Sequence, residues 1–476
     1  MSFKRIFFKN ISTLAIYNYS TQGVEFLATI VLSRLLLPDE YGFVAMISIF
    51  ASFIRLFSTL GIGAVVVRTN YKYTYHKHLF SLAIWIGIAL SILLSLLSYP
   101  IALFFENMEL VVPTMVVSIK FIFDSFTFIP IAVLNKNLNF NAVGKIKLFG
   151  TIGQIVFMIL LAWLGFSYWS LIIPLIINPI VQYLFLRRYV HLPFVMYGWR
   201  ATKRMIYRIR SLMGHLSLNN LVRYWSSNTD KLVIGRFYTE SDLGLYNRAF
   251  RFIQLNNKLI TSIFNSVLFP SLKKLMDEKG NAHKEYLDII RIITLVNMPL
   301  VIILVIFPEE LVRILWGKDW TGVAPFLPYV GILMVIRSII STMSSLYLLY
   351  RKERNLFFIN LSVSLMNIGL VIVGSLFSTM HIIKFLTLGY LFFAVPVNTF
   401  YGFYKAFGFR VRMLLRFWIP TLLLGMALFA SVHFEMLPLS LGGLAIYISY
   451  MLFELRSSVS GTFRFIKGKL NKNQDS

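Results

Sequence analysis

Long apolar segments separated by short polar stretches dominate this chain. Most of them reach about 20 residues, the length at which a helix crosses the hydrocarbon core of a bilayer. The run over residues 79–104 is continuous, whereas a strand of a membrane barrel alternates over about ten residues. We therefore predict an all-α integral membrane protein with about 14 transmembrane helices, near residues 12–37, 41–66, 79–104, 111–135, 148–166, 168–187, 211–237, 243–270, 287–307, 321–350, 355–378, 382–404, 414–434 and 437–456.

Composition supports a membrane protein over a soluble one. Of 476 residues, 57% are hydrophobic and 14% are charged, while soluble domains carry about 25% charged residues. The chain has no cysteine, which excludes disulfides, thiolate metal sites and cysteine nucleophiles. The net charge of +26, from 46 Lys and Arg against 20 Asp and Glu, could indicate nucleic acid, anionic lipid or an anionic substrate, so the placement of the charges must decide.

Lysine and arginine are concentrated on one side of the predicted membrane protein. Most of them lie in every second loop, including the basic connection over residues 187–210 and the tail from Arg456. Short cytoplasmic loops are enriched in these residues, so both termini are predicted to be cytoplasmic. Most of the positive charge then reflects topology, and we expect no nucleic-acid partner. Few cations fall on the opposite side: Arg34, Arg236, Arg313, Lys318 and Lys384.

An internal repeat appears when the sequence is shifted by about 202 residues. The shift places Arg34 on Arg236 and Gly42 on Gly244, each pair within a tight acidic turn between two spans. Six spans separate the turns, so the copies are predicted to cross the membrane in the same direction, with a substrate site between two six-helix lobes. The predicted organisation is an N-lobe over 1–188 (spans 1–6), a basic cytoplasmic linker over 189–210, a C-lobe over 211–404 (spans 7–12), spans 13 and 14 over 405–456, and a basic cytoplasmic tail over 457–476.

Polar and charged residues form stripes along the two helices that open each lobe. An ionisable group at bilayer depth costs about 2.5–3.5 kcal/mol, so each stripe is expected to face protein or a water-filled cavity. Together the four stripes contain six cations and two acids, Glu25 and Asp230. This excess of positive charge favours an anionic ligand such as a pyrophosphate. The candidate substrate-binding cations are Arg55, Lys258, Arg223, Arg251 and Arg248, with Lys231 as the sixth; the cavity-lining polar residues are Asn18, Gln22, Ser52, Asn220 and Gln254.

Several of these positions also have an ordinary structural interpretation. Arg248 and Lys231 lie near a membrane surface, where long side chains reach the headgroups. Asp124 can pair with Lys120 one turn away on the same helix. The acids that could couple transport to an ion gradient are Glu25, Asp124 and Asp230. We expect no catalytic residue, metal site or organic cofactor, and leave coupling to protons or sodium open.

Four segments resemble bacterial polysaccharide exporters of the Wzx type, in the multidrug/oligosaccharidyl-lipid/polysaccharide (MOP) superfamily. They are 32–42, 219–236, 244–246 and 268–272. The resemblance implies a flippase that moves an undecaprenyl-pyrophosphate-linked oligosaccharide across the bacterial inner membrane by alternating access. The product would be capsule, exopolysaccharide, teichuronic acid, or the O-antigen of lipopolysaccharide. It also implies cavity cations on the first, second, seventh and eighth helices, and a polysaccharide polymerase and other assembly proteins as partners.

Two other functions remain open from the sequence. A multidrug or cation antiporter of the same fold should prefer an acidic cavity, which the excess of cations opposes. A membrane-embedded glycosyl or acyl transferase needs paired carboxylates or a catalytic histidine near one membrane face. The pairs Asp39–Glu40 and Glu309–Glu310 lie on that side, but each suits a turn or the end of a helix.

Overall fold

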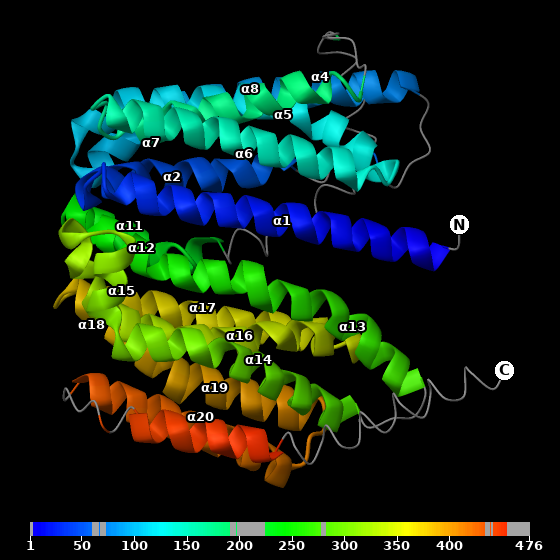
Figure 1. The fold of residues 1–476 in the computed structure, drawn as a ribbon, viewed down its shortest axis with the longest axis vertical. Helices are drawn as coiled ribbons and strands as arrows, with labels where there is room; N and C mark the ends of the chain where they lie inside the picture. The colour runs from blue at the N-terminus through cyan, green and yellow to red at the C-terminus, as the bar shows by residue number, and fades with distance from the viewer. Residues whose placement is uncertain are drawn as a thin grey trace. The chain divides into compact units, whose positions relative to one another are not determined.

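Every regular element of the described chain is a helix. The computed structural model describes residues 3–59, 66, 73–190, 197, 224–277, 282–433, 438 and 441–454 (Figure 1). Within these residues nine helices are long and apolar enough to cross a membrane, and two shorter apolar segments, Trp418–Ser431 and Leu441–Glu454, accompany them. The all-helical, multi-pass membrane class is therefore confirmed, while the total of fourteen spans stays a prediction.

Contacts divide the chain into two compact units. The first comprises Met1–Asn247 together with Leu315–Trp320, and the second comprises Arg248–Ile314 and Thr321–Ser476. The predicted lobe boundaries stay a prediction, and most of the predicted linker lies outside the described residues. The first unit contains α1 (Phe3–Ser33), α2 (Pro38–Thr59), α4 (Tyr73–Phe105), η1 (Met108–Leu110), α5 (Val111–Lys136), α6 (Phe140–Trp163), α7 (Trp169–Ile172), α8 (Pro174–Leu186), α11 (Thr229–Phe237) and the start of α12 (Glu240–Asn256).

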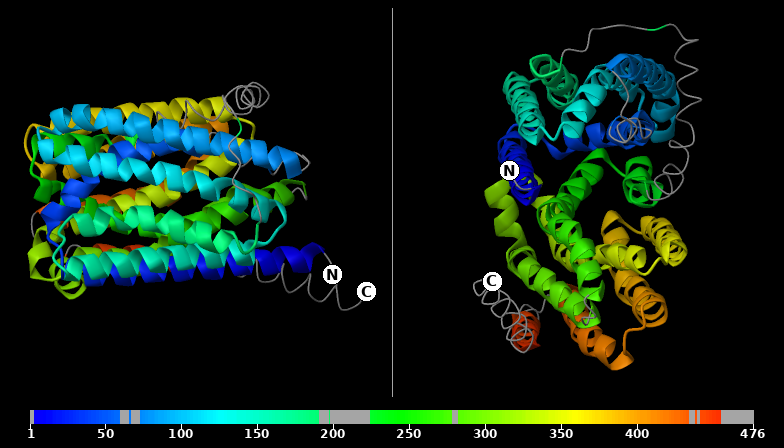
Figure 2. Two further views of the ribbon diagram at one scale, coloured as in Figure 1. Left: turned by 90° about the horizontal axis from the view of Figure 1, so that it is seen from above. Right: turned by 90° about the vertical axis from the view of Figure 1, so that its right-hand side faces the viewer.

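Small residues allow the helices of the first unit to approach closely. In the end-on view of Figure 2, α1 lies beside α6, and α4 lies beside α5. Gly144 of α6 faces the ring of Tyr17 on α1, whose hydroxyl donates to Asn141 at 2.7 Å. Gly87 of α4 faces the backbone carbonyl of Phe121 on α5. Close packing of this kind replaces the hydrophobic effect, which gives no driving force between helices in lipid.

The second unit is built around α16 (Leu327–Leu349), which is buried along most of its length. Its first ten residues are apolar apart from the Tyr329 hydroxyl, and Leu333 and Tyr347 are fully buried. The other elements of the unit are the rest of α12, η2 (Asn257–Thr261), α13 (Ser262–Asp277), α14 (Ala282–Ile306), α15 (Pro308–Leu315) up to Ile314, η3 (Lys318–Phe326) from Thr321, α17 (Glu353–Ser375), α18 (Thr379–Gly389), η4 (Tyr390–Ala394), α19 (Val395–Val397), η5 (Asn398–Ala406), α20 (Val411–His433) and the helix Leu441–Glu454.

The connection between the predicted spans 287–307 and 321–350 is folded. It forms α15 and the start of η3, and Trp320 is fully buried. The Trp320 indole donates to the Ser33 carbonyl at 3.0 Å and packs edge-on against Tyr41. This aromatic anchor satisfies a carbonyl at the end of α1, which has no partner within its own helix.

The two repeated turns contact each other reciprocally inside the first unit. A Cβ added at Gly42 would lie 1.7 Å from the carbonyl oxygen of Glu240, and one added at Gly244 would lie 2.0 Å from that of Pro38. Pro38 and Glu240 occupy equivalent positions of the repeat, as do Gly42 and Gly244. The same backbone contact is therefore made twice in opposite directions, which is what two related copies produce around a local two-fold axis.

Hydrogen bonds in the two turns repeat as well. The Leu37 amide donates to the Glu40 carboxylate at 2.7 Å, and the equivalent Thr239 amide donates to Asp242 at 3.2 Å. Each acid satisfies an amide just before its helix, as in a capping box. The sequence match thus extends to backbone geometry, and we call residues 37–42 and 239–244 the turn pair.

The glycine contact predicts a sharp effect of a single methyl group. Gly42→Ala and Gly244→Ala should each lower the melting temperature of the purified protein, because overpacking a backbone contact costs about 1–3 kcal/mol. Gly23→Ala is the matched control, since nothing lies within 4 Å of a Cβ at that helical glycine. Equal melting temperatures for the Gly42→Ala, Gly23→Ala and unmodified proteins would contradict the close contact.

Candidate functional site

The polar stripes of α1 and α2 are only partly covered by protein. Asn18 is exposed, while Gln22 and Glu25 are half-buried along α1. On α2, Ser52 and Arg55 are exposed and follow one another along a single face. The structure therefore leaves these predicted cavity residues accessible, as a ligand-binding face requires.

Aromatic side chains border the stripe of α2. The Tyr224 hydroxyl donates to the Ile49 carbonyl, and the rings of Phe53 and Trp225 lie 4.7 Å apart. These contacts join the middle of the seventh predicted span to α2 within the first unit. Asn220 and Arg223, which sequence reasoning placed on the same span, lie outside the described residues.

The predicted coupling acids differ in their surroundings. Asp124 pairs with Lys120, and both side chains are largely buried. Asp230 is buried and accepts from the Tyr246 hydroxyl at 2.8 Å and from the Lys231 amide at 2.8 Å. Glu25 is half-buried on the open stripe of α1. Asp230 therefore acts as a hydrogen-bond acceptor that holds α11 against α12, and the coupling roles of all three acids stay predictions.

The second unit carries the other predicted cations on α12 and η2. Arg248 is 7% exposed, which differs from the expected reach toward a membrane surface. Arg251 donates to Gln254 at 3.5 Å, a long contact within one helical turn. Lys258 is exposed and lies in η2, a π-helical turn. Such turns insert an extra residue into a helix and occur frequently at functional sites.

The π-helical turn separates a buried side from an exposed one. Asn256 is 2% exposed and donates to Ser338 of α16 at 2.7 Å, and the Thr261 hydroxyl lies 3.3 Å from the same oxygen. These bonds fix η2 on α16 while Lys258 stays exposed. The turn thus positions the lysine rigidly, a feature that a regular helical repeat does not predict.

Arg337 of α16 has aromatic partners that were not apparent in the sequence. Its guanidinium carbon lies 4.9 Å from the ring centre of Tyr390 and 5.9 Å from that of Phe250. A cation over a desolvated ring is stabilised by about 2 kcal/mol. Arg337 therefore has a packing role in the second unit.

Sequence reasoning missed one buried group of charges. Asp288 and Arg291 fall in the predicted span 287–307 and were given no role, yet both are buried in α14, where Arg291 pairs with Asp288 and also contacts Glu454 of the last described helix. The available signal was an Asp and an Arg spaced i, i+3 at the start of a span, together with an acid at the end of an apolar segment.

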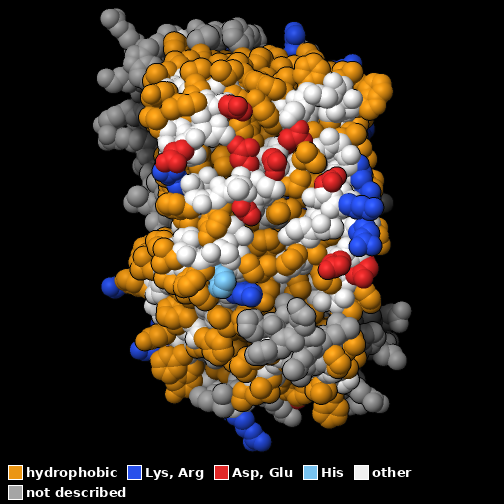
Figure 3. Space-filling view, turned by 90° about the vertical axis from the view of Figure 1, so that its left-hand side faces the viewer, with side chains coloured by type: hydrophobic (Ala, Val, Ile, Leu, Met, Phe, Trp, Pro, Cys, Tyr) orange, Lys and Arg blue, Asp and Glu red, His pale blue; other side chains and the backbone are white. Residues whose placement is uncertain are grey.

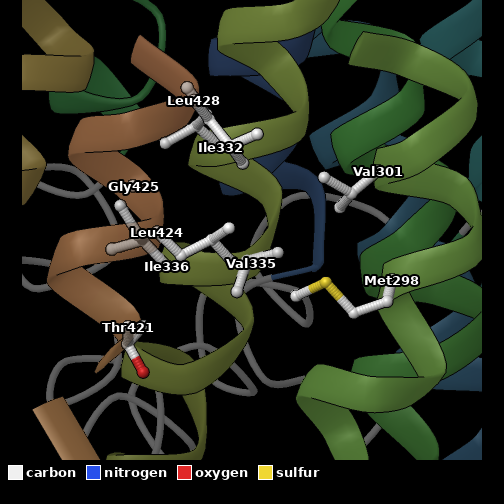
Figure 4. Close-up of a pocket in the computed structure, with 9 residues that line it drawn as sticks. All are labelled: Met298, Val301, Ile332, Val335, Ile336, Thr421, Leu424, Gly425 and Leu428. Carbon is white, nitrogen blue, oxygen red and sulfur yellow. The ribbon is translucent and has the colours of Figure 1, made fainter. Parts of the chain in front are cut away.

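An apolar cavity in the second unit is too small for a substrate. It lies among α14, α16 and α20, and its volume of about 20 Å³ is close to that of one water molecule (Figure 4). Met298 and Val301 face Ile332 and Val335 across it, with Thr421 at one end. A cationic or polar ligand has no partner there.

Comparison with known proteins identifies the family. The model of the family described as "Polysaccharide biosynthesis protein" matches residues 31–325. The chain belongs to this family. This family member is 25% identical to the teichuronic acid biosynthesis protein TuaB of Bacillus subtilis, over 73% of this chain and 71% of that protein.

Two further comparisons extend the likeness. The lipopolysaccharide biosynthesis protein WzxC of Escherichia coli is 21% identical over 74% of this chain and 72% of its own length. The solved structure of the lipid II flippase MurJ in an inward closed conformation aligns with a TM-score of 0.66 at 16% identity, over 94% of this chain and 99% of MurJ. The resemblance to MurJ concerns the fold alone.

Acidic side chains gather around the turn pair of this family member. Figure 3 shows them in red over the end of the first unit where α1 meets α2. Glu240 accepts from the Asn107 amide at 2.6 Å, and Glu106 pairs with Arg236. Burial raises the pKa of the Glu240 carboxyl; the Asn107 hydrogen bond opposes this rise and the charges of Asp39 and Glu109 add to it. The Arg236 guanidinium, in contrast, lowers the pKa of the exposed Glu106.

The pKa values of Glu240 and Glu106 shift in opposite directions, so replacing each carboxylate with a neutral amide should affect the melting temperature differently. A raised folded-state pKa gives stability that is present below the ordinary value of 4.5 and is lost as pH rises through the folded-state pKa. Glu240→Gln should therefore raise the melting temperature near neutral pH and flatten its decline with pH. Glu106→Gln is the matched control, since it should lower or leave unchanged the melting temperature at the same pH. A lower melting temperature for Glu240→Gln would contradict the argument.

Proposed function

We propose that this protein is a flippase that moves an undecaprenyl-pyrophosphate-linked oligosaccharide across the bacterial inner membrane by alternating access. Family membership supports transport for polysaccharide assembly, and the names of its relatives refer to teichuronic acid and lipopolysaccharide biosynthesis. The observation that carries the proposal is the exposed cationic and polar stripe of α2, with Ser52 and Arg55 at its centre. An exposed guanidinium at membrane depth needs an anionic partner or water.

The cations would bind the pyrophosphate while the polyprenyl chain stays in lipid. A guanidinium matches phosphate oxygens with two parallel hydrogen bonds, and the surrounding low dielectric strengthens the attraction. Arg55 would bind from α2, and Lys258 would bind from the π-helical turn η2. Exposed amides and hydroxyls such as those of Asn18 and Ser52 would bind sugar hydroxyls.

The proposal gives the protein no bond-making chemistry. A drug antiporter of the same fold remains the second candidate, and it should show no preference for pyrophosphate lipids. Polysaccharide polymerase and other assembly proteins are proposed partners. Protons or sodium would drive the cycle, with Glu25 as the proposed coupling acid of the first unit because it is half-buried on the open stripe of α1.

Removing the two cations tests the function directly. The Arg55→Ala, Lys258→Ala double variant should accumulate lipid-linked oligosaccharide on the cytoplasmic face at normal membrane abundance. Each lost charge-assisted bond costs about 1.5–3 kcal/mol, so export should fall about tenfold or more. Arg55→Lys should retain part of the activity, since lysine keeps the charge but lacks the planar fork.

Abundance separates binding from folding in this test. If Arg55 instead held a buried structural pair, its loss would cost about 3–5 kcal/mol and the protein would become scarce. Lys352→Ala, an exposed cation outside the stripes, is the matched control and should export normally. Normal abundance with normal export in the double variant would overturn the anionic-ligand proposal.

The proposed topology has its own test. A cysteine replacing Asp319, exposed in η3, should react with a membrane-impermeant thiol reagent in intact cells. A cysteine replacing Asn137, exposed between α5 and α6, should be protected until the membrane is opened. The native chain has no cysteine, so background labelling is absent. Protection at Asp319 with labelling at Asn137 would invert the topology.

A further inference from the structure

Three buried charged side chains link α14 to the helix Leu441–Glu454 in the second unit. Arg291 donates from Nη1 to Asp288 Oδ1 at 2.6 Å and from Nη2 to Glu454 Oε2 at 3.0 Å. None of the three side chains is more than 9% exposed. One guanidinium is therefore shared between two carboxylates, and each carboxylate uses a single oxygen for it. We call Asp288, Arg291 and Glu454 the buried triad.

The triad lies inside a predicted membrane span. The apolar segment of α14 begins at His283, so Asp288 lies about 8 Å further along the helix. Tyr447 of the terminal helix hydrogen-bonds Thr421 of α20 at 3.0 Å and also Thr294 of α14, one turn from Arg291. Among the described residues the three charges therefore lie between two helices, beside a network of hydroxyl groups.

Asp288 is incompletely satisfied in this enclosure. Its Oδ2 atom is buried and has no hydrogen-bond partner among the described residues. Glu454 makes further contacts besides Arg291, so Asp288 is the less satisfied of the two acids. A buried carboxylate oxygen without a partner is costly, and intramembrane acids of this kind commonly take part in proton relays.

We propose that Asp288 is a proton-binding site that couples transport to a proton gradient. The proton adds to Oδ2 and forms an O–H bond, and its release restores the carboxylate paired with Arg291. Protonation removes one of the two negative charges that share the guanidinium. The ion pair between Asp288 and Arg291 is then weakened, and Arg291 stays paired with Glu454. The coupling role rests on the proposed transport function, whereas the proton site itself does not.

Other charged groups near α14 are exposed, half-buried or engaged with other partners. On α14 itself, His283 contacts the Tyr350 hydroxyl at 3.0 Å, Lys284 is exposed one turn before Asp288, and Glu285 is half-buried. The terminal helix carries Tyr447 and Tyr450 besides Glu454. Of the cations with described side chains on the elements packed against α14, Lys258, Lys273 and Arg412 are exposed and Arg337 lies over Tyr390. Arg291 is the cation that contacts Asp288 in the described part of the chain.

Infrared spectroscopy of the purified full-length protein in lipid tests the site without any substrate. A pH titration should show the C=O stretch of a protonated carboxylic acid that grows as pH falls. Labelling aspartate with ¹³C at its side-chain carboxyl should shift this band in the unmodified protein, a measurement that needs no variant. Other carboxyls contribute to this band, so the site is isolated as the difference between the unmodified protein and Asp288→Asn, which should contain a label-sensitive C=O band. The difference for Glu285→Gln, the matched control on the same helix, should contain none. A difference for Asp288→Asn without a label-sensitive C=O band would overturn the proposal, because a purely structural triad stays ionised.

Transport then tests the coupling. Asp288→Asn should lose the part of lipid-linked oligosaccharide flipping that responds to an imposed pH difference across proteoliposomes, while Glu285→Gln should keep it. Full gradient-driven flipping by Asp288→Asn would overturn the coupling role. If the unmodified protein flips no pyrophosphate lipid at all, the transport proposal fails, and the infrared result still decides whether Asp288 binds a proton.

Discussion

Lipid offers no hydrogen bonds, and the structure follows from that constraint. Backbone groups in a bilayer must be satisfied within the protein, so the described elements are all helical, and each polar side chain needs a local partner. Thr294 and Ser338 illustrate the point, because each buried hydroxyl donates to a carbonyl four residues earlier in its own helix. Groups that a single helix does not satisfy, such as Arg291 and Glu454, pair between helices.

The lack of hydrogen-bond partners in lipid also bears on the polar side chains that are exposed. Apolar side chains cover most helix surfaces, yet Asn18, Ser52 and Arg55 are exposed along two neighbouring predicted spans. Leaving them in contact with lipid would be costly, so a water-filled, ligand-binding face is the arrangement that accounts for them. Family membership and this face together favour transport of a lipid-linked anion.

Close backbone contact at the turn pair connects the repeat in the sequence to packing within the first unit. Gly42 and Gly244 bring two helix starts together with no side chain between them, and Asn107 and Arg236 add polar contacts nearby. A Cβ at either glycine would overlap a backbone carbonyl of the other turn, so the contact requires a glycine in both copies of the repeat.

The sequence by itself determined the all-helical membrane class and the repeat of the two turns, because apolar length and glycine spacing are local features of the chain, while the total of fourteen spans stays a prediction. Tertiary structure decided which charges are accessible. Arg55 and Arg248 both lie on helices with polar stripes, yet one is exposed and the other is 7% exposed. The π-helical turn at Lys258 and the approach of Glu454 to Arg291 depend on packing between segments distant in sequence. The helical periodicity of the sequence does not predict such contacts, because the burial and pairing of a side chain depend on the neighbouring helix as much as on the residue itself.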